Sequence, residues 1–395
     1  MFVVGRRSAT VVAALAWILL VPGIAAAAGW SQFHGRADRT GVTTTETVLT
    51  AATAPTLHRL WAAPTGASAD GINSSPAVWR DRVYIGSDDG ALWAFDAVTG
   101  AELWHDGVES PIRSSPAVAD RRVFFGTEGG SIVADRAASG ARLWSYDMGA
   151  KITASPLVVG STVYIGSRGG TLIALDAADG SVLWMTKPFE VWGMWGGPAY
   201  ANGVVFVGTE RSEVDAYDAT TGFRLWATRL GARVRSTPSV VDGSVFVGTD
   251  AGQVAALDAA TGAVRWITAA AAPETTPVVR SSPAVSDGLV IVATAETTPM
   301  DGTAVALDEA TGAEVWRSPL ADYSTSSPAI ANGVVYVGSY DTRLYAIDEL
   351  TGTLLWAPTW GVDNLPRGIN SSPAIAGGRV YIGCRDGSLY AFGVS

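Results

Sequence analysis

Short runs of apolar residues, mostly β-branched or aromatic, alternate along this chain with Gly, Asp and Pro, and the pattern recurs every 40 to 50 residues. The clearest copy covers residues 74–104, SSPAVWRDRVYIGSDDGALWAFDAVTGAELW. It holds four strand signals, at residues 74–78, 83–86, 91–95 and 102–104, each bounded by turn residues. A tryptophan ends every copy: Trp61, Trp104, Trp144, Trp184, Trp226, Trp266, Trp316 and Trp356.

A repeat of this length built from short strands predicts an all-β fold, an eight-bladed β-propeller of four-stranded antiparallel blades. The first-strand signal occurs eight times, each time with a proline: Pro76, Pro116, Pro156, Pro198, Pro238, Pro283, Pro328 and Pro373. The last copy lacks a fourth strand, whereas residues 57–61 look like a fourth strand with no three before it. We therefore expect the N-terminal strand to complete the last blade, because closure removes exposed sheet edges. The repeated tryptophans should pack between blades.

The link between the third and fourth strands usually has the form Asp-x-x-Thr-Gly, as in residues 96–100 and 218–222. The Asp accepts hydrogen bonds from turn amides, and the Gly adopts positive φ without steric cost. These acids are therefore predicted to be structural. Blade 2 departs from the rule, because Asp135 comes one place early and Arg136 occupies the Asp position.

The N-terminus differs from the repeat and divides the chain into three parts: a signal peptide at residues 1–28, a lead-in at 29–56 and the propeller at 57–395. Arg6 and Arg7 precede the apolar run 11–21, and a run of alanines at 25–28 follows Pro22. This order is typical of a cleaved secretory signal. The alternative is an uncleaved anchor, since residues 11–28 are long enough to span a membrane. The cleaved form predicts an extracytoplasmic protein without a stable membrane span.

Charge and composition argue against several functions. With 27 basic and 37 acidic residues, the formal net charge is −10, which disfavours nucleic acid and anionic membrane surfaces as partners. The single cysteine, Cys384, excludes a disulfide within the chain, and its position matches serines in other copies. The three histidines, His34, His58 and His105, do not show metal-ligand spacing. We assign no catalytic residue and no metal ligand.

The repeat SSPA…VYVGS…LYAIDxxTGxxLW resembles the pyrroloquinoline quinone (PQQ) enzyme repeat of quinoprotein alcohol dehydrogenases. The opening Trp30-Ser31-Gln32-Phe33 resembles the lead-in of the same superfamily, so the likeness covers residues 30–395. It implies the fold. For function it implies several classes: PQQ- and calcium-dependent dehydrogenases, a propeller lipoprotein of outer-membrane barrel assembly, and sensor domains.

The chain also departs from the dehydrogenase pattern. Those enzymes are longer, and many have adjacent cysteines over the quinone, which one Cys cannot supply. Their calcium needs converging Glu, Asn and Asp oxygens, and the sequence shows no unambiguous set. We therefore expect a non-catalytic binding or scaffold module and assign no cofactor to it. A dehydrogenase using PQQ and calcium on an alcohol or sugar is the alternative.

The mouth of the ring is the candidate site. The residue three places before each first-strand proline should face the axial funnel: Asn73, Arg113, Thr153, Trp195, Arg235, Arg280, Thr325 and Asn370. Arg113, Arg235 and Arg280 would bind a small anionic ligand, because guanidinium groups bind carboxylate or phosphate in a bidentate way. Alternatively, each Arg pairs with an acid of the same face, such as Glu128, Glu210, Asp250 or Glu296.

Two further aromatics, Trp192 and Trp195, lie outside the repeated tryptophan series in the link at residues 185–196. They would stack on a planar ligand or anchor a peptide, or else cap the apolar ends of blades 3 and 4. The expected partner is thus a protein or a small anion bound by Arg113, Arg235, Arg280, Asn73, Asn370, Trp192 and Trp195. We expect the protein to be a monomer.

Overall fold

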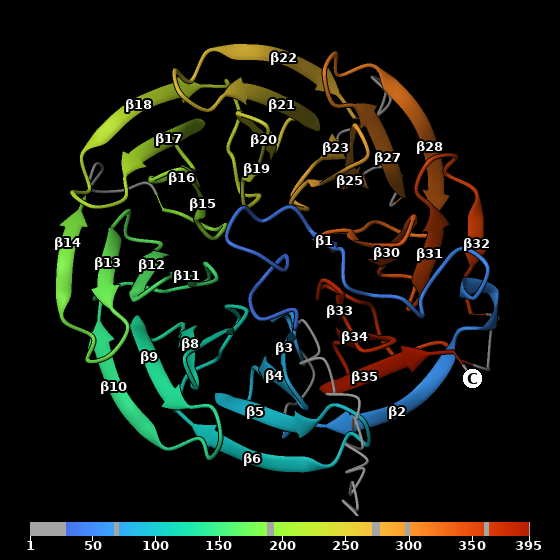
Figure 1. The fold of residues 1–395 in the computed structure, drawn as a ribbon, viewed down its shortest axis with the longest axis horizontal. Coiled ribbons are helices and arrows are strands. Elements are labelled where there is room, and N and C mark those ends of the chain that lie inside the picture. Colours follow the sequence, from blue (N-terminus) through green and yellow to red (C-terminus); the bar gives the residue numbers. More distant parts are fainter. Residues whose placement is uncertain are drawn as a thin grey trace, which may run out of the picture.

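The computed structural model describes residues 29–66, 71–187, 193–270, 277–296, 301–358 and 363–394 and forms a closed ring of eight blades (Figure 1). Blade 1 contains β3 (Ala77–Trp79), β4 (Arg82–Gly86), β5 (Ala91–Asp96) and β6 (Glu102–Gly107), and blade 2 contains β7 (Ala117–Ala119), β8 (Arg122–Gly126), β9 (Ser131–Arg136) and β10 (Arg142–Asp147). Blade 3 contains β11 (Leu157–Val159), β12 (Thr162–Gly166), β13 (Leu172–Asp176) and β14 (Val182–Thr186), and blade 4 contains β15 (Ala199–Ala201), β16 (Val204–Gly208), β17 (Glu213–Asp218) and β18 (Arg224–Arg229).

The second half of the ring repeats the same order of strands. Blade 5 contains β19 (Ser239–Val241), β20 (Ser244–Gly248), β21 (Gln253–Asp258) and β22 (Val264–Ala269), and blade 6 contains β24 (Ala284–Ser286), β25 (Leu289–Ala293), β27 (Gly302–Asp308) and β28 (Glu314–Leu320). Blade 7 contains β29 (Ala329–Ala331), β30 (Val334–Gly338), β31 (Leu344–Asp348) and β32 (Leu354–Trp356), and blade 8 contains β33 (Ala374–Ala376), β34 (Arg379–Gly383), β35 (Ser388–Gly393) and β2 (His58–Pro64).

The predicted closure of the ring is confirmed. Strand β2 pairs antiparallel with β35, with Ala62 opposite Tyr390 and Pro64 opposite Ser388. The N-terminal segment therefore supplies the outer strand of blade 8. Within each blade the second strand is buried on both faces, because neighbouring blades pack against it, and it is almost continuously apolar. The outer strands alternate in exposure, as expected for strands with one face in solvent.

The repeated tryptophans pack between blades as predicted. The Trp184 ring lies 5.8 Å from that of Tyr164, centroid to centroid, and its Nε1 donates to the Ala219 carbonyl of the next blade at 2.9 Å. The turn glycine of that next blade faces the same ring. A Cβ on Gly222 would lie 2.6 Å from the Trp184 ring, and the residue has φ +72°. Backbone conformation and close packing thus both require glycine here.

The turn aspartates are structural, as expected. Asp96 Oδ1 accepts hydrogen bonds from the amides of Val98 and Thr99 and from the Thr99 hydroxyl, at 2.8–3.0 Å. These bonds hold the pKa of Asp96 below its usual value, and Arg265 together with Thr261 lowers the pKa of Asp258 to about 2.

The lead-in crosses the centre of the ring, where it closes the axis (Figure 1). Inner strands of a propeller leave amides facing the axis, and backbone carbonyls of residues 30–41 accept six of them at 2.6–2.9 Å. The donors are Val78, Val118, Tyr200, Val240, Val285 and Ile330. The side-chain oxygen of Gln32 accepts a seventh, from Val158. One segment thus contacts seven blades in chain order.

Two buried side chains fix this lead-in. Arg39 donates to the carbonyls of Phe33, Pro156 and Pro198, and burial lowers its pKa to about 9. The two ring nitrogens of His34 lie 2.7 Å and 2.9 Å from the carbonyl oxygens of Arg39 and Pro328, and burial lowers the pKa of the ring to about 4.

Three details depart from the simple repeat. Strand β1 (Val42–Thr43) pairs parallel with β29, so the blade 7 sheet has five strands, and a short 3-10 helix, η1 (Ala54–Thr56), precedes β2. In blade 6, β23 (Pro277–Val278) and β26 (Ala295–Glu296) pair antiparallel and form a small two-stranded ribbon beside the blade. Among the described residues, no helix is long and apolar enough to cross a membrane.

Candidate funnel site

The eight residues predicted to face the funnel all line one cavity on the ring axis. Its volume is about 220 Å³, and Phe33 of the lead-in also lines it. Each of the eight comes just before the first strand of its blade, so the circular arrangement of those strands brings them together. The convergence was expected from the repeat; the contacts among these side chains depend on residues elsewhere.

The first group of contacts, which we call the asparagine arc, consists of Thr325, Asn370, Asn73, Asp88, Arg113, Glu128 and Lys151. Asn370 donates to Asn73 at 2.7 Å, and Asn73 donates to Asp88 at 3.0 Å. Arg113 then bonds Asp88 through two nitrogens, both at 3.2 Å, and reaches Glu128 at 3.3 Å. Burial raises the pKa of Asp88, and Arg113 opposes that shift.

The second group, the tryptophan arc, consists of Arg168, Trp195, Glu210, Arg235, Asp250 and Arg280. Arg235 bonds Glu210 at 2.9 Å and lies 3.3 Å from Asp250, which also accepts from Arg280 at 3.1 Å. The Arg235 side chain is only 15% exposed. Asp250 therefore bridges two of the three predicted arginines, and the pairs are partly shielded from solvent.

Within this arc, Trp195 contacts three charged side chains. The guanidinium of Arg168 lies 3.6 Å from its ring centroid, and that of Arg235 lies 4.8 Å away. The indole Nε1 donates to Glu210 at 2.6 Å. Both guanidinium contacts are cation–π geometries, so two cations and one carboxylate already contact this side chain.

The alternative stated for the arginines is what the geometry favours. Arg113, Arg235 and Arg280 each engage a carboxylate, and the partners include Glu128, Glu210 and Asp250. The anion site of three available guanidinium groups is therefore not formed as expected, because acids of the same face neutralise them. Trp192 and the side chain of Glu296 lie outside the described part of the chain. Met194 is fully buried at the end of blade 3.

Asp88 and Arg168 are members of the arcs that the sequence argument did not identify. Both lie two places after the glycine that ends the second strand, as do Glu128, Glu210 and Asp250. Around the ring, this position alternates with the one that lies three places before each first-strand proline. Aligning the position after the second strand across all blades would therefore have identified the acidic partners of the arginines from the sequence.

The funnel residues do not fit calcium or PQQ. Asn73, Asn370 and Asp88 supply oxygens, but the two amides bond one another and Arg113 places a positive charge against the carboxylate. A divalent cation would meet that charge, whereas calcium needs six to eight oxygens. Across the described residues, no three His, Cys, Asp or Glu side chains group as metal ligands. The 220 Å³ cavity is also below the ~300 Å³ typical of small-molecule sites.

Cys384 is also unsuited to chemistry. Its side chain is buried, its sulfur lies 3.2 Å from the Arg367 carbonyl, and burial raises the pKa of the thiol to about 12. A reactive cysteine needs a populated thiolate. The equivalent Ser339 likewise donates to a carbonyl, that of Asp322, at 3.0 Å, which supports the interpretation of Cys384 as a serine substitute.

Known proteins share this fold at low sequence identity. BamB from Moraxella catarrhalis superposes with a TM-score of 0.71 at 21% identity, covering 86% of this chain and 98% of that one. Quinohemoprotein alcohol dehydrogenase from Comamonas testosteroni superposes with a TM-score of 0.76 at 16% identity, covering 93% and 80%. A europium-containing methanol dehydrogenase gives 0.76 at 16%, covering 93% and 98%. At such identities the likeness shows the fold alone.

In sequence, the Comamonas testosteroni dehydrogenase also matches over 36 residues at 50% identity, which is 9% of this chain and 5% of the enzyme. A stretch of that length corresponds to about one repeat. The family model described as outer membrane protein assembly factor BamB matches far more, over residues 45–190, 189–298 and 279–395. The chain therefore belongs to this family of PQQ-like β-propellers.

Proposed function

We propose that this protein is an exported, non-catalytic propeller that binds a partner protein on its funnel face. The observation that carries the proposal is Trp195, which contacts Arg168, Arg235 and Glu210 within a set of five basic and four acidic side chains that pair with one another. Trp, Arg and Tyr dominate the binding energy of protein interfaces. Side chains held in place before binding lose less entropy when a partner docks.

A second aromatic pair strengthens this proposal. Tyr323 and Tyr340 stack with ring centroids 4.0 Å apart, and the guanidinium of Arg385 lies 5.3 Å from the Tyr340 ring. These residues belong to blades 7 and 8, across the ring from Trp195. The funnel face therefore offers two fixed aromatic–arginine groups with a shallow polar cavity between them, a shape suited to a polypeptide. The family description, an assembly factor, is consistent with a protein partner.

The alternative function, a dehydrogenase using PQQ and calcium, rests on the shared fold. The arrangement of Asn73, Asp88 and Arg113 does not favour it.

Export is proposed from residues 1–28, and sequencing the mature N-terminus tests it. We expect the mature chain to start at Ala28 or Gly29, whereas intact Met1 in the membrane would indicate an anchor.

Face-specific crosslinking tests the proposed binding function. A photoreactive residue replaces Lys151 or Arg233 on the funnel face, and Ala260 or Ala310 on the opposite face. We expect one discrete crosslinked partner from the two funnel positions, with a yield reduced by the additional change Arg280→Ala. Equal yields from both faces, or a partner captured only through Ala260 and Ala310, would contradict the proposal.

A further inference from the structure

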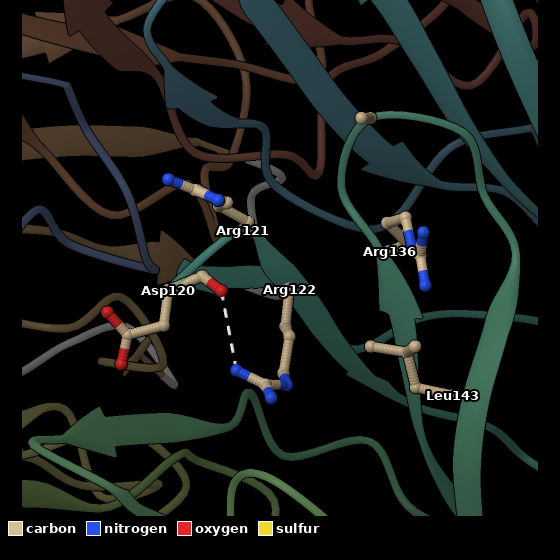
Figure 2. A pocket seen from close by; sticks show the side chains of 6 residues that line it. Asp120, Arg121, Arg122, Arg136 and Leu143 are labelled. Atoms are coloured by element: carbon tan, nitrogen blue, oxygen red, sulfur yellow. Dashed lines mark hydrogen bonds between the residues drawn. The ribbon is translucent and has the colours of Figure 1, made fainter.

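A second basic site lies on the face opposite the funnel, in blade 2. A pocket of about 660 Å³ is lined by Asp120, Arg121, Arg122, Arg136, Ala138 and Leu143 (Figure 2). Arg121 lies in the turn between β7 and β8, Arg122 begins β8, and Arg136 ends β9. Three guanidinium groups thus surround one pocket in a chain whose net charge is −10.

These arginines differ from those of the funnel because carboxylates do not neutralise them. Within the described residues, none of the three lies within ion-pair distance of an acid, and Arg122 Nε is buried without a hydrogen-bond partner. Its NH1 only reaches the Asp120 carbonyl, at 3.4 Å. Arg122 and Arg136 are also directly opposite one another on paired strands. Like charges in such a cross-strand pair are destabilising.

The pocket exists where blade 2 departs from the repeat. In five other blades the turn aspartate accepts the amide two places on at 2.7–3.2 Å. Blade 2 has Arg136 instead, and the amide of Ala138 has no acceptor in the part of the chain that the structure describes. In blade 2, the space that the turn aspartate carboxylate occupies in other blades is therefore bordered by the unpaired Ala138 amide and by arginines.

The backbone of the neighbouring turn is also unusual. Arg121 has φ +65°, at a position where blades 4 to 8 place glycine with φ between +73° and +82°. A long side chain in this left-handed conformation costs free energy that glycine avoids. Such local strain often marks functional positions. Here it retains a guanidinium beside the pocket.

From these observations we propose that the pocket binds a carboxylate group of a ligand. The carboxylate takes the place of the missing turn aspartate, accepts from the Ala138 amide and pairs with Arg122, Arg136 and Arg121. Carboxylate–guanidinium bonds are charge-assisted and directional. The binding also removes the repulsion between Arg122 and Arg136. This site is independent of the function proposed for the funnel.

Calorimetric titration with citrate at low ionic strength tests the proposal, because screening weakens exposed charges at higher salt. The decisive variant is Arg136→Asp, which restores the turn aspartate found in other blades. It should weaken citrate binding by about tenfold or more, since charge-assisted bonds are lost and an internal carboxylate competes. Its melting temperature should not fall, so a loss of binding would not reflect misfolding.

Two further variants separate this pocket from other effects. Arg121→Gly introduces the residue of blades 4 to 8; it should raise the melting temperature yet weaken citrate binding. Arg235→Ala alters the funnel and should leave citrate binding unchanged. A parallel titration with a capped tri-aspartate peptide shows whether the pocket prefers a carboxylate of a polypeptide or of a small molecule, because the preferred source binds more tightly than the other. Absence of citrate binding to the parent, or equal affinity in the parent and Arg136→Asp, would overturn the proposal.

Discussion

At the scale of single residues, glycines and buried acids show how tightly the blades constrain their side chains. Gly222 and Gly203 both have positive φ, of +72° and +82°, but only a Cβ on Gly222 meets a neighbour within 4 Å, the Trp184 ring. Gly222→Ala should therefore lower the free energy of unfolding by about 2–4 kcal/mol, because backbone strain and overpacking add.

Gly203→Ala is the matched control for that measurement. It should cost about 1–2 kcal/mol, since strain alone applies. Urea unfolding of both variants measures the difference. Equal losses in the two proteins would show that the contact between Gly222 and the tryptophan ring does not limit packing between blades.

Asp215 predicts a pH dependence of stability. Its side chain is fully buried on β17, one oxygen lacks a hydrogen-bond partner, and burial raises the pKa of the carboxyl to about 6. Between the unfolded value near ~3.9 and about 6, the folded protein binds more protons than the unfolded chain, so Asp215 makes stability fall as pH rises. Asp215→Asn should remove a decline on the order of 2 kcal/mol between pH 4 and pH 7, measured by urea unfolding. A parent and variant with parallel stability profiles would contradict this assignment.

At the scale of elements, the lead-in holds the inner strands together through amides of seven blades. Deleting residues 29–41 should expose the Val118 and Val240 amides and increase their hydrogen exchange, because their acceptors are Ser31 and Asp38. The second-strand amides of Val123 and Val245 are the internal control and should stay protected. Unchanged exchange at Val118 and Val240 would show that the lead-in is dispensable for the inner strands.

The sequence predicts the elements well because every blade must repeat the same packing. The tryptophan spacing and the turn motif predicted the blades, and the isolated fourth strand at residues 57–61 predicted how the ring closes. The role of residues 29–41 was not predictable in this way, since the segment contacts the blades mostly through backbone carbonyls, which no side-chain pattern encodes. The funnel positions followed from the repeat as well. The partners of Arg113 and Arg235 did not, because pairing depends on distances between side chains of different blades.

At the scale of the whole molecule, ring closure should control both stability and solubility. Deleting residues 57–61 removes much of β2 and leaves β35 as an exposed edge of blade 8. We expect a lower melting temperature and self-association, because unpaired strand edges invite pairing with other chains. Calorimetry and analytical ultracentrifugation measure the two effects. A variant that melts at the parent temperature as a monomer would contradict the closure of the ring by this strand.

The two faces of the ring carry different electrostatics. Arginines of the funnel are paired with acids, whereas those beside Ala138 lack an acidic partner among the described residues and surround a pocket. We propose that the funnel serves binding rather than redox chemistry, because its carboxylates are paired with arginines. The fold that this chain shares with quinoprotein dehydrogenases does not decide this point, since one propeller architecture supports several functions.

The most direct test is reconstitution of the purified protein with PQQ and calcium, followed by a dye-linked assay with alcohols and sugars. We expect no turnover above the protein-free background, with or without a chelator, because Arg113 opposes a cation beside Asp88. An Arg113→Ala variant assayed in parallel shows whether that charge matters. Turnover by the parent protein that a chelator abolishes would contradict the account and establish a dehydrogenase.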